Sequence, residues 1–237
     1  MIRKAFPPLA AFLFASIVFA SNTAAADAQT TAPPTAFERQ LDKLDLSIAG
    51  VGLYNSTVSG TVVSGLGASN QGEAMTQHAS NTLGALISIH YPAKPYFGLE
   101  FNYSYGRYTE NYTGPAISTF LPNGTTDFQV QTKVTEYTFG YLITPPYTIF
   151  GFQPFASVGG GPMSFVPTPR GGQEEPEKAR MTYYYSLGVQ KDLTPHFGLT
   201  AGFRELFFKA PDFGQNYLTI LKLATTYEPT AGFYIRY

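Results

Sequence analysis

The chain has 237 residues, with 15 basic and 16 acidic side chains and no cysteine. This length allows one or two domains. The balanced charge provides no basic surface for nucleic acid, and the lack of cysteine excludes disulfide scaffolds, thiolate metal sites and cysteine nucleophiles. A mean hydropathy near zero argues against a bundle of membrane helices but is compatible with a membrane β-barrel, in which only alternate residues face lipid.

The first 28 residues are predicted to be an export signal peptide. Arg3 and Lys4 provide a charged start, an apolar run of 12 residues follows at 9–20, and small residues up to Ala28 offer cleavage sites. Twelve apolar residues are too few for a membrane-spanning helix, which needs ~20. An uncleaved anchor helix is the alternative.

Residues 29–43 are polar and are predicted to form a periplasmic lead-in, which leaves 44–237 as one domain built from strands. Bulky apolar residues alternate there with small or polar ones, and this period of two is typical of strands whose two faces meet different surroundings. Eight stretches carry the pattern, at about 44–56, 83–91, 97–106, 136–143, 149–165, 183–190, 197–204 and 226–237.

The connections between these stretches alternate in length. Long polar loops are predicted at 57–81, 109–129 and 166–180, and short turns, each containing proline, at 92–95, 144–148 and 193–196. Transmembrane barrels have an even number of strands, long extracellular loops and short periplasmic turns. The chain is therefore predicted to form an eight-stranded antiparallel up-and-down transmembrane β-barrel.

The two faces of the predicted strands indicate which side meets lipid. One face carries bulky residues, and the other carries small residues and scattered charges. Because the interior of an eight-stranded barrel is only just wide enough for side chains, the small face suits the lumen and the bulky face suits hydrocarbon. A secreted soluble barrel, with the faces reversed, is the alternative. The residues predicted to face lipid are Phe97, Leu99, Phe101, Phe197, Leu199, Phe203, Phe233 and Ile235.

Charged residues on the small face are predicted to form a network inside the lumen. A lone charge there would cost several kcal/mol, so two to four of these groups are expected to pair. The network is interpreted as a structural plug, with a gate for a narrow channel as the alternative. Its predicted members are Glu100, Glu136, Arg204, Glu228 and Arg236.

The final strand ends in alternating apolar residues, Phe233, Ile235 and Tyr237. A C-terminal strand that ends on an aromatic residue is typical of outer-membrane barrels, in which it acts as the assembly signal. Because of this C-terminal strand and the hairpin at 193–204, the chain resembles the small OmpA/OmpX-type outer-membrane barrels over residues 44–237. The resemblance implies a monomeric barrel that meets periplasmic chaperones and the barrel-assembly machinery on its way to the outer membrane.

One motif suggests an enzyme. The segment His78-Ala-Ser-Asn81 matches the His-x-Ser-Asn motif of outer-membrane lipid A deacylases, in which the histidine activates the serine. It lies before the second predicted strand, whereas the motif of that family lies late in the barrel. An ordinary polar loop is therefore preferred. His90 and His196 lack metal-ligand spacing, so neither a metal nor a cofactor is expected.

The sequence thus predicts a non-enzymatic protein of the Gram-negative outer membrane. Its role is expected to be envelope integrity or surface interaction through the loops, with a narrow gated channel or a lipid A-modifying hydrolase as alternatives. The expected partners are outer-membrane lipids and lipopolysaccharide, and no nucleic acid. The charged segment 170–180 is predicted to be a solvated loop tip, with contact to lipopolysaccharide or a host surface as the alternative.

Overall fold

A computed structural model describes residues 44–63, 71–114 and 126–236 of the chain. The predicted export signal (1–28), the lead-in (29–43) and Tyr237 lie outside the described residues. The strands are β1 (Asp45–Asn55), β2 (Val58–Thr61), β3 (Ala74–Ala79), β4 (Thr82–Tyr91), β5 (Phe97–Thr113), β6 (Asp127–Ile143), β7 (Gln153–Pro167), β8 (Lys178–Thr194), β9 (Phe197–Lys209) and β10 (Leu223–Arg236), with a short 3-10 helix, η2 (Asn216–Leu218).

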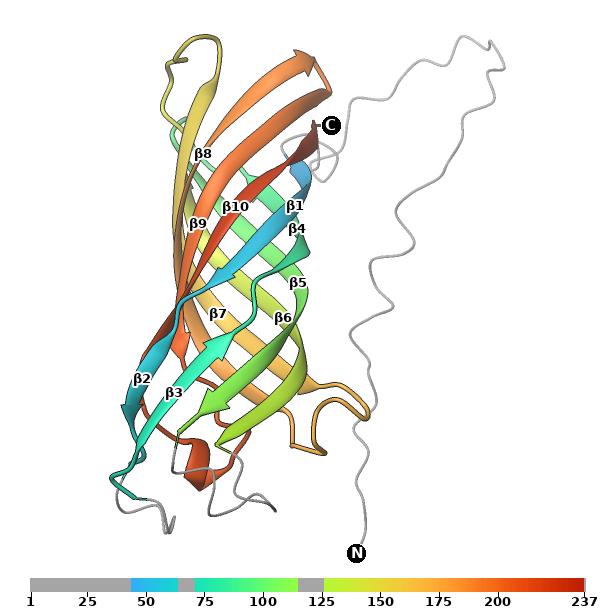
Figure 1. The fold of residues 1–237 in the computed structure, drawn as a ribbon. Helices are drawn as coiled ribbons and strands as arrows, with labels where there is room; N and C mark the ends of the chain where they lie inside the picture. The colour runs from blue at the N-terminus through green and yellow to red at the C-terminus, as the bar shows by residue number, and fades with distance from the viewer. Residues whose placement is uncertain (1–43, 64–70, 115–125, 237) are drawn as a thin grey trace, which may run out of the picture. The chain divides into compact units, whose positions relative to one another are not determined.

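These strand segments form one antiparallel sheet that closes on itself (Figure 1). Neighbouring segments are paired from β4 through β1, β10, β9, β8, β7 and β6 to β5, and β5 returns to β4. The first strand pairs with the last, with Asp45 opposite Arg236. The prediction of a closed eight-stranded antiparallel barrel is confirmed.

The ten segments form eight barrel strands, because two of the barrel strands are each interrupted once. β2 continues β1 after a break at Ser56, and β4 continues β3 after a break at Ser80. Asn55 ties the two breaks together, since its backbone N–H donates to Asn81 Oδ1 (2.9 Å) and its side-chain amide donates to the Ser80 carbonyl (3.0 Å). The two interruptions therefore lie side by side in the wall.

The predicted loop at 57–81 is wrong in part, because residues 58–61 and 74–79 are the strands β2 and β3. The segment is rich in Ser, Thr, Gly and Gln, which hides the strand pattern. β5 and β6 likewise extend to Thr113 and start at Asp127, inside the predicted loop at 109–129. The wall of the barrel is thus longer than the apolar alternation alone indicates.

The barrel has two ends that differ in construction. The inner end is the one at which Asp45 of β1 lies opposite Arg236 of β10. At the outer end, loop 210–222, which contains η2, connects β9 to β10 and packs Phe213, Leu218 and Ile220 out of solvent. Figure 1 shows η2 at the opposite end of the barrel from the C-terminus. Among the described residues, no helix is long and apolar enough to cross a membrane.

Glycines let aromatic rings lie flat across the narrow interior. A Cβ at Gly198 would collide with the ring of Tyr234, and a Cβ at Gly140 would collide with the hydroxyl of Tyr184. Tyr184 and Tyr234 are both buried. The close packing of an eight-stranded barrel interior therefore depends on pairs of a glycine and an aromatic residue, on neighbouring strands for Gly198 with Tyr234 and across one intervening strand for Gly140 with Tyr184.

Candidate functional site: the lumen and its outer mouth

Three buried charges meet in the inner half of the lumen. Arg204 on β9 donates from one terminal nitrogen to Glu136 Oε1 on β6 (2.6 Å) and from the other to Glu228 Oε2 on β10 (2.8 Å). Arg204 is only 3% exposed and both carboxylates 1% exposed. Thr138 donates a further hydrogen bond to Glu136 (2.9 Å). One guanidinium thus joins β6 to β9 and β10 across the lumen.

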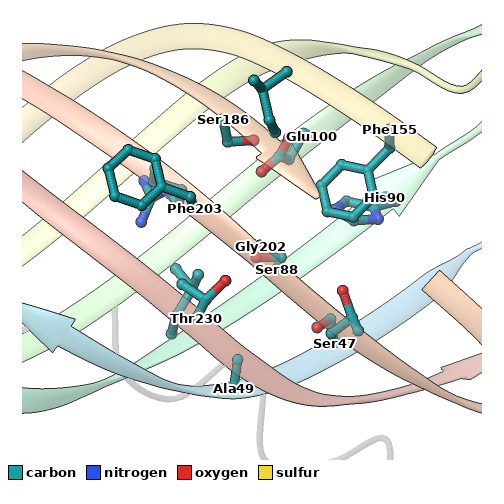
Figure 2. A pocket seen from close by; sticks show the side chains of 14 residues that line it. Ser47, Ala49, Ser88, His90, Glu100, Phe155, Ser186, Gly202, Phe203 and Thr230 are labelled. Carbon is teal, nitrogen blue, oxygen red and sulfur yellow. The ribbon is translucent and has the colours of Figure 1, made fainter. Parts of the chain in front are cut away.

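Glu100 lies in the same part of the lumen but outside this ion pair. It lines a cavity of about 30 Å³ together with His90 and Arg204, and Figure 2 shows Glu100 and His90 pointing into that space. Its Oε2 atom is buried without a hydrogen-bond partner among the described residues, as are Glu136 Oε2 and Arg204 Nε. A cavity of this size holds about one or two water molecules, which suits these polar atoms.

Tyr184 braces the charged cluster. The Arg204 guanidinium lies 4.9 Å from the centroid of its ring, a geometry that favours the cation. The Tyr184 hydroxyl accepts a hydrogen bond from the Asn102 amide (3.2 Å), and Asn102 accepts one from Ser88 (2.6 Å). A chain of polar contacts therefore crosses the lumen from Ser88 through Asn102 and Tyr184 to Arg204.

The structure does not bring Arg236 to this cluster. Arg236 binds Asp45 at the inner rim through two hydrogen bonds (2.9 and 3.1 Å), and its third contact, to Asp192, is 3.4 Å. Its side chain is 34% exposed. The alternation of the last strand placed Arg236 on the inward face, but its position at the strand end lets it reach the rim instead.

The outer half of the lumen is filled mainly by large apolar side chains, with buried Gln77 and Glu110 among them, so the expectation of a small and ionic lumen throughout is wrong there. The buried side chains in this half come from β1, β3, β5, β6, β7 and β9 and include large rings. The small inward residues of the inner half did not indicate these rings. They include Val51, Leu53, Met75, Tyr108, Tyr112, Phe128, Val130, Val134, Met163, Phe165, Leu206 and Phe208.

Loop 210–222 closes this apolar half as a stopper. The ring of Phe213 lies 6.4 Å from that of Tyr112, in an edge-on arrangement. The hydroxyl of Tyr112 donates to the Pro211 carbonyl (2.7 Å), and Gln77 donates to the same carbonyl (3.3 Å) and to buried Glu110 (3.0 Å). Both apolar packing and hydrogen bonds therefore hold the loop inside the mouth.

A second set of contacts fastens the loop to β8 and to the β7–β8 connection. Arg180 pairs with Asp212 (2.6 Å). Glu175 accepts hydrogen bonds from Gln215 (2.7 Å) and Tyr217 (3.3 Å). Burial and the neighbouring Glu175 raise the pKa of Tyr217 to about 12, so Tyr217 stays a neutral donor at ordinary pH. Part of the charged segment 170–180 thus serves the closure of the mouth.

The residues predicted to face lipid lie on the outward face of the wall. Phe97 is 54% exposed and Phe203 41% exposed. Outward rings of adjacent strands contact one another, as Phe101 does with Phe139 (4.8 Å) and Phe197 with Phe233 (5.8 Å). The remaining predicted members, Leu99, Leu199 and Ile235, are also exposed. An outer surface this apolar is unusual for a protein in water.

The His78–Asn81 segment is not arranged as a catalytic site. The ring of His78 is hydrogen-bonded to the Thr57 hydroxyl (3.1 Å), and the Ser80 hydroxyl accepts from the Thr109 backbone N–H (3.0 Å). No hydrogen bond joins His78 to Ser80. Among the described residues, no group of three or more His, Cys, Asp or Glu side chains is placed to hold a metal ion.

The closed barrel, its apolar outer face and its filled lumen define the fold of the eight-stranded outer-membrane β-barrel proteins. No protein-family model and no curated protein sequence matches the chain. Among solved structures, the outer membrane protein OprG from Pseudomonas aeruginosa is similar with a TM-score of 0.55 and 12% identity, over 82% of this chain and 95% of OprG.

Two further solved structures show the same kind of likeness. Neisserial surface protein A aligns with a TM-score of 0.48 and 12% identity, over 82% of this chain and 97% of that protein. Ail of Yersinia pestis, in complex with the heparin analogue sucrose octasulfate, aligns with a TM-score of 0.38 and 14% identity, over 81% and 99%. At these identities the likeness concerns the fold alone.

Proposed function

We propose that the chain is a non-enzymatic outer-membrane barrel that does not conduct, and that it serves surface contact or envelope integrity through the rim at its outer end. The observation that carries the proposal is the double closure of the lumen. The inner half is filled by the ion pairs of Arg204, and the outer half is filled by apolar side chains and stoppered by loop 210–222.

The outer end also supports a role in contact. On β5 the outward residues are aromatic or aliphatic up to Tyr105 and then become Arg107, Thr109 and Asn111. If the apolar band lies in the membrane, the strands continue beyond it as a rigid, water-facing collar. Such a collar displays the loops on ordered β-structure, which holds a binding surface more firmly than long free loops do.

Conductance tests this proposal directly. The full chain is inserted into planar lipid bilayers, and the current is compared with that of a deletion variant lacking residues 211–221 that also carries Arg204→Ala. We expect negligible current from the unaltered protein and more frequent current steps from the variant, because the loop that closes the mouth and the guanidinium that joins the two carboxylates have then been removed. Frequent steps from the unaltered protein would contradict the proposal and favour a gated channel.

A second experiment tests the location. Cells that produce the protein are separated into inner and outer membranes, and the protein is run on a gel with and without boiling. We expect it in the outer membrane with a heat-dependent shift in migration, as a stable closed barrel gives. Recovery in a soluble fraction without detergent would contradict the proposed location.

A further inference from the structure

Two positive charges face each other on the outward surface. Arg107 on β5 and Lys133 on β6 are direct partners in the register of these strands. Both belong to the outward set, because their neighbours Gly106, Tyr108 and Val134 point inward. Residues directly opposite on antiparallel strands have Cβ atoms roughly 4.5–5.5 Å apart, and like charges in this position are destabilising.

Nothing among the described residues neutralises this pair. Neither side chain belongs to an ion pair. The acidic Glu177, beyond β7, accepts a hydrogen bond from Ser164 (2.5 Å). Arg107 uses only Nε, which donates to the Tyr105 hydroxyl (2.9 Å), so its two terminal nitrogens remain available for an external acceptor.

The pair lies where the outer surface changes character. On the inner-end side of it the outward rings of Tyr103 and Tyr137 are in contact (5.2 Å). On the outer-end side the next two facing pairs are neutral and polar, Thr109 opposite Gln131 and Asn111 opposite Gln129, and the acidic Asp127 lies at the end of the strand pair. Tyrosine rings gather at the level of lipid headgroups in membrane barrels. In a barrel that spans the outer membrane with the end at loop 210–222 outermost, Arg107 and Lys133 would therefore lie at the height of the headgroups of the outer leaflet.

We propose that Arg107 and Lys133 together bind a phosphate group of a phosphorylated glycolipid in the outer leaflet. A guanidinium offers paired donors that match two phosphate oxygens, and an ammonium adds a point charge. A phosphate between the two cations would also remove their mutual repulsion. The inference rests on the proposed function, since only a barrel that spans the membrane puts the pair at that height.

Binding of defined lipids tests the site. The full chain, purified in a non-ionic detergent, is titrated with bisphosphorylated lipid A and with chemically dephosphorylated lipid A, and bound lipid is counted by native mass spectrometry. We expect the phosphorylated lipid to bind more tightly, and the variant R107Q/K133Q to lose about tenfold of that affinity. The variant K94Q/K191Q, which loses the same charge from exposed lysines at the inner end, should bind as the unaltered chain does.

The proposal would be overturned by equal binding of the two lipids, by equal loss in both charge variants, or by no loss in R107Q/K133Q. An excess of inorganic phosphate separates the two sources of the ligand. If it displaces the lipid completely, the site binds free phosphate and the lipid proposal fails. Glutamine at the exposed position 107 and the half-buried position 133 is not expected to affect folding, and heat-dependent gel migration checks this. The conductance and fractionation experiments use the unaltered pair, so failure of the proposed function would be recognised separately.

Discussion

The two halves of the barrel interior are filled by different means. In the inner half, buried polar groups around Arg204 depend on a few directional contacts, and the charges of Arg204, Glu136 and Glu228 are paired with one another. In the outer half, aliphatic and aromatic side chains pack with one another and with Phe213 of loop 210–222. A change to one member of the polar half leaves another buried charge without a partner, whereas the apolar half loses contacts in proportion to the atoms removed.

The largest expected effect comes from Arg204→Met. Removing the guanidinium leaves Glu136 and Glu228 buried without a counter-charge, and breaking such a buried pair costs about 3–5 kcal/mol. The free energy of unfolding, measured by urea titration in detergent micelles, should fall by that amount.

The control for this prediction restores neutrality. In the variant R204M/E136Q/E228Q no charge remains in the cluster, and we expect most of the lost stability to return, because a neutral replacement of a buried ion network is often well tolerated. If the triple variant is as unstable as R204M alone, the loss reflects packing rather than charge.

A smaller effect is expected in the apolar half. Phe213→Ala removes a buried ring from the stopper and should lower the free energy of unfolding by about 3 kcal/mol. Hydrogen exchange should increase most in loop 210–222, where the contacts of the ring are lost. Leu221→Ala is the matched control, since Leu221 is 57% exposed in the same loop. Equal effects of the two substitutions would show that the loop is not a packed stopper.

Packing of an aromatic ring against glycine gives the next effect. Gly198→Ala places a methyl group against the ring of Tyr234, and such overpacking costs typically about 1–3 kcal/mol. In a Tyr234→Ala background the same glycine substitution should cost much less. A double-mutant cycle in urea measures this coupling, and a coupling energy near zero would contradict the proposed contact.

The smallest effect is expected at the inner rim. Asp45→Asn weakens the ion pair with Arg236, whose side chain is 34% exposed. The Asp45 side chain is 11% exposed, so the pair should contribute near the upper end of the about 0.2–1 kcal/mol measured for surface pairs. The loss should also shrink at high salt, which screens exposed charges. A loss as large as that of R204M would remove the distinction between the rim and the buried cluster.

The sequence predicted the strands of the inner half well because their alternation has a strict period of two. Phe97, Leu99 and Phe101 alternate with Gly98, Glu100 and Asn102, and every member lies on the expected face. The same parity placed Glu136, Arg204 and Glu228 inward. Their pairing depends on the register of β9 with β10 and on closure of the barrel, which brings β6 across the lumen, and no local pattern specifies either.

The outer half could not be predicted in the same way. Its strands carry polar residues on the outward face and large apolar residues on the inward face, as at Tyr108 and Tyr112. In the inner half the bulky residues face outward and the small or polar residues face inward, so the prediction was based on the opposite pattern. Loop 210–222 has no periodicity, and only its apolar Phe213, Leu218 and Ile220 indicated that part of it is buried. Its position in the mouth depends on contacts with residues far away in the sequence, such as Tyr112 on β5, and these contacts form only when the barrel closes.

The central claim is that the bulky face of each strand meets hydrocarbon while the lumen is packed with side chains. Because the chain contains no tryptophan, a single Trp can report on each face. Phe203→Trp and Leu206→Trp are refolded into bilayers that contain brominated lipid, and the fluorescence of each is measured. We expect strong quenching at position 203 and little at position 206. The opposite pattern would contradict the account.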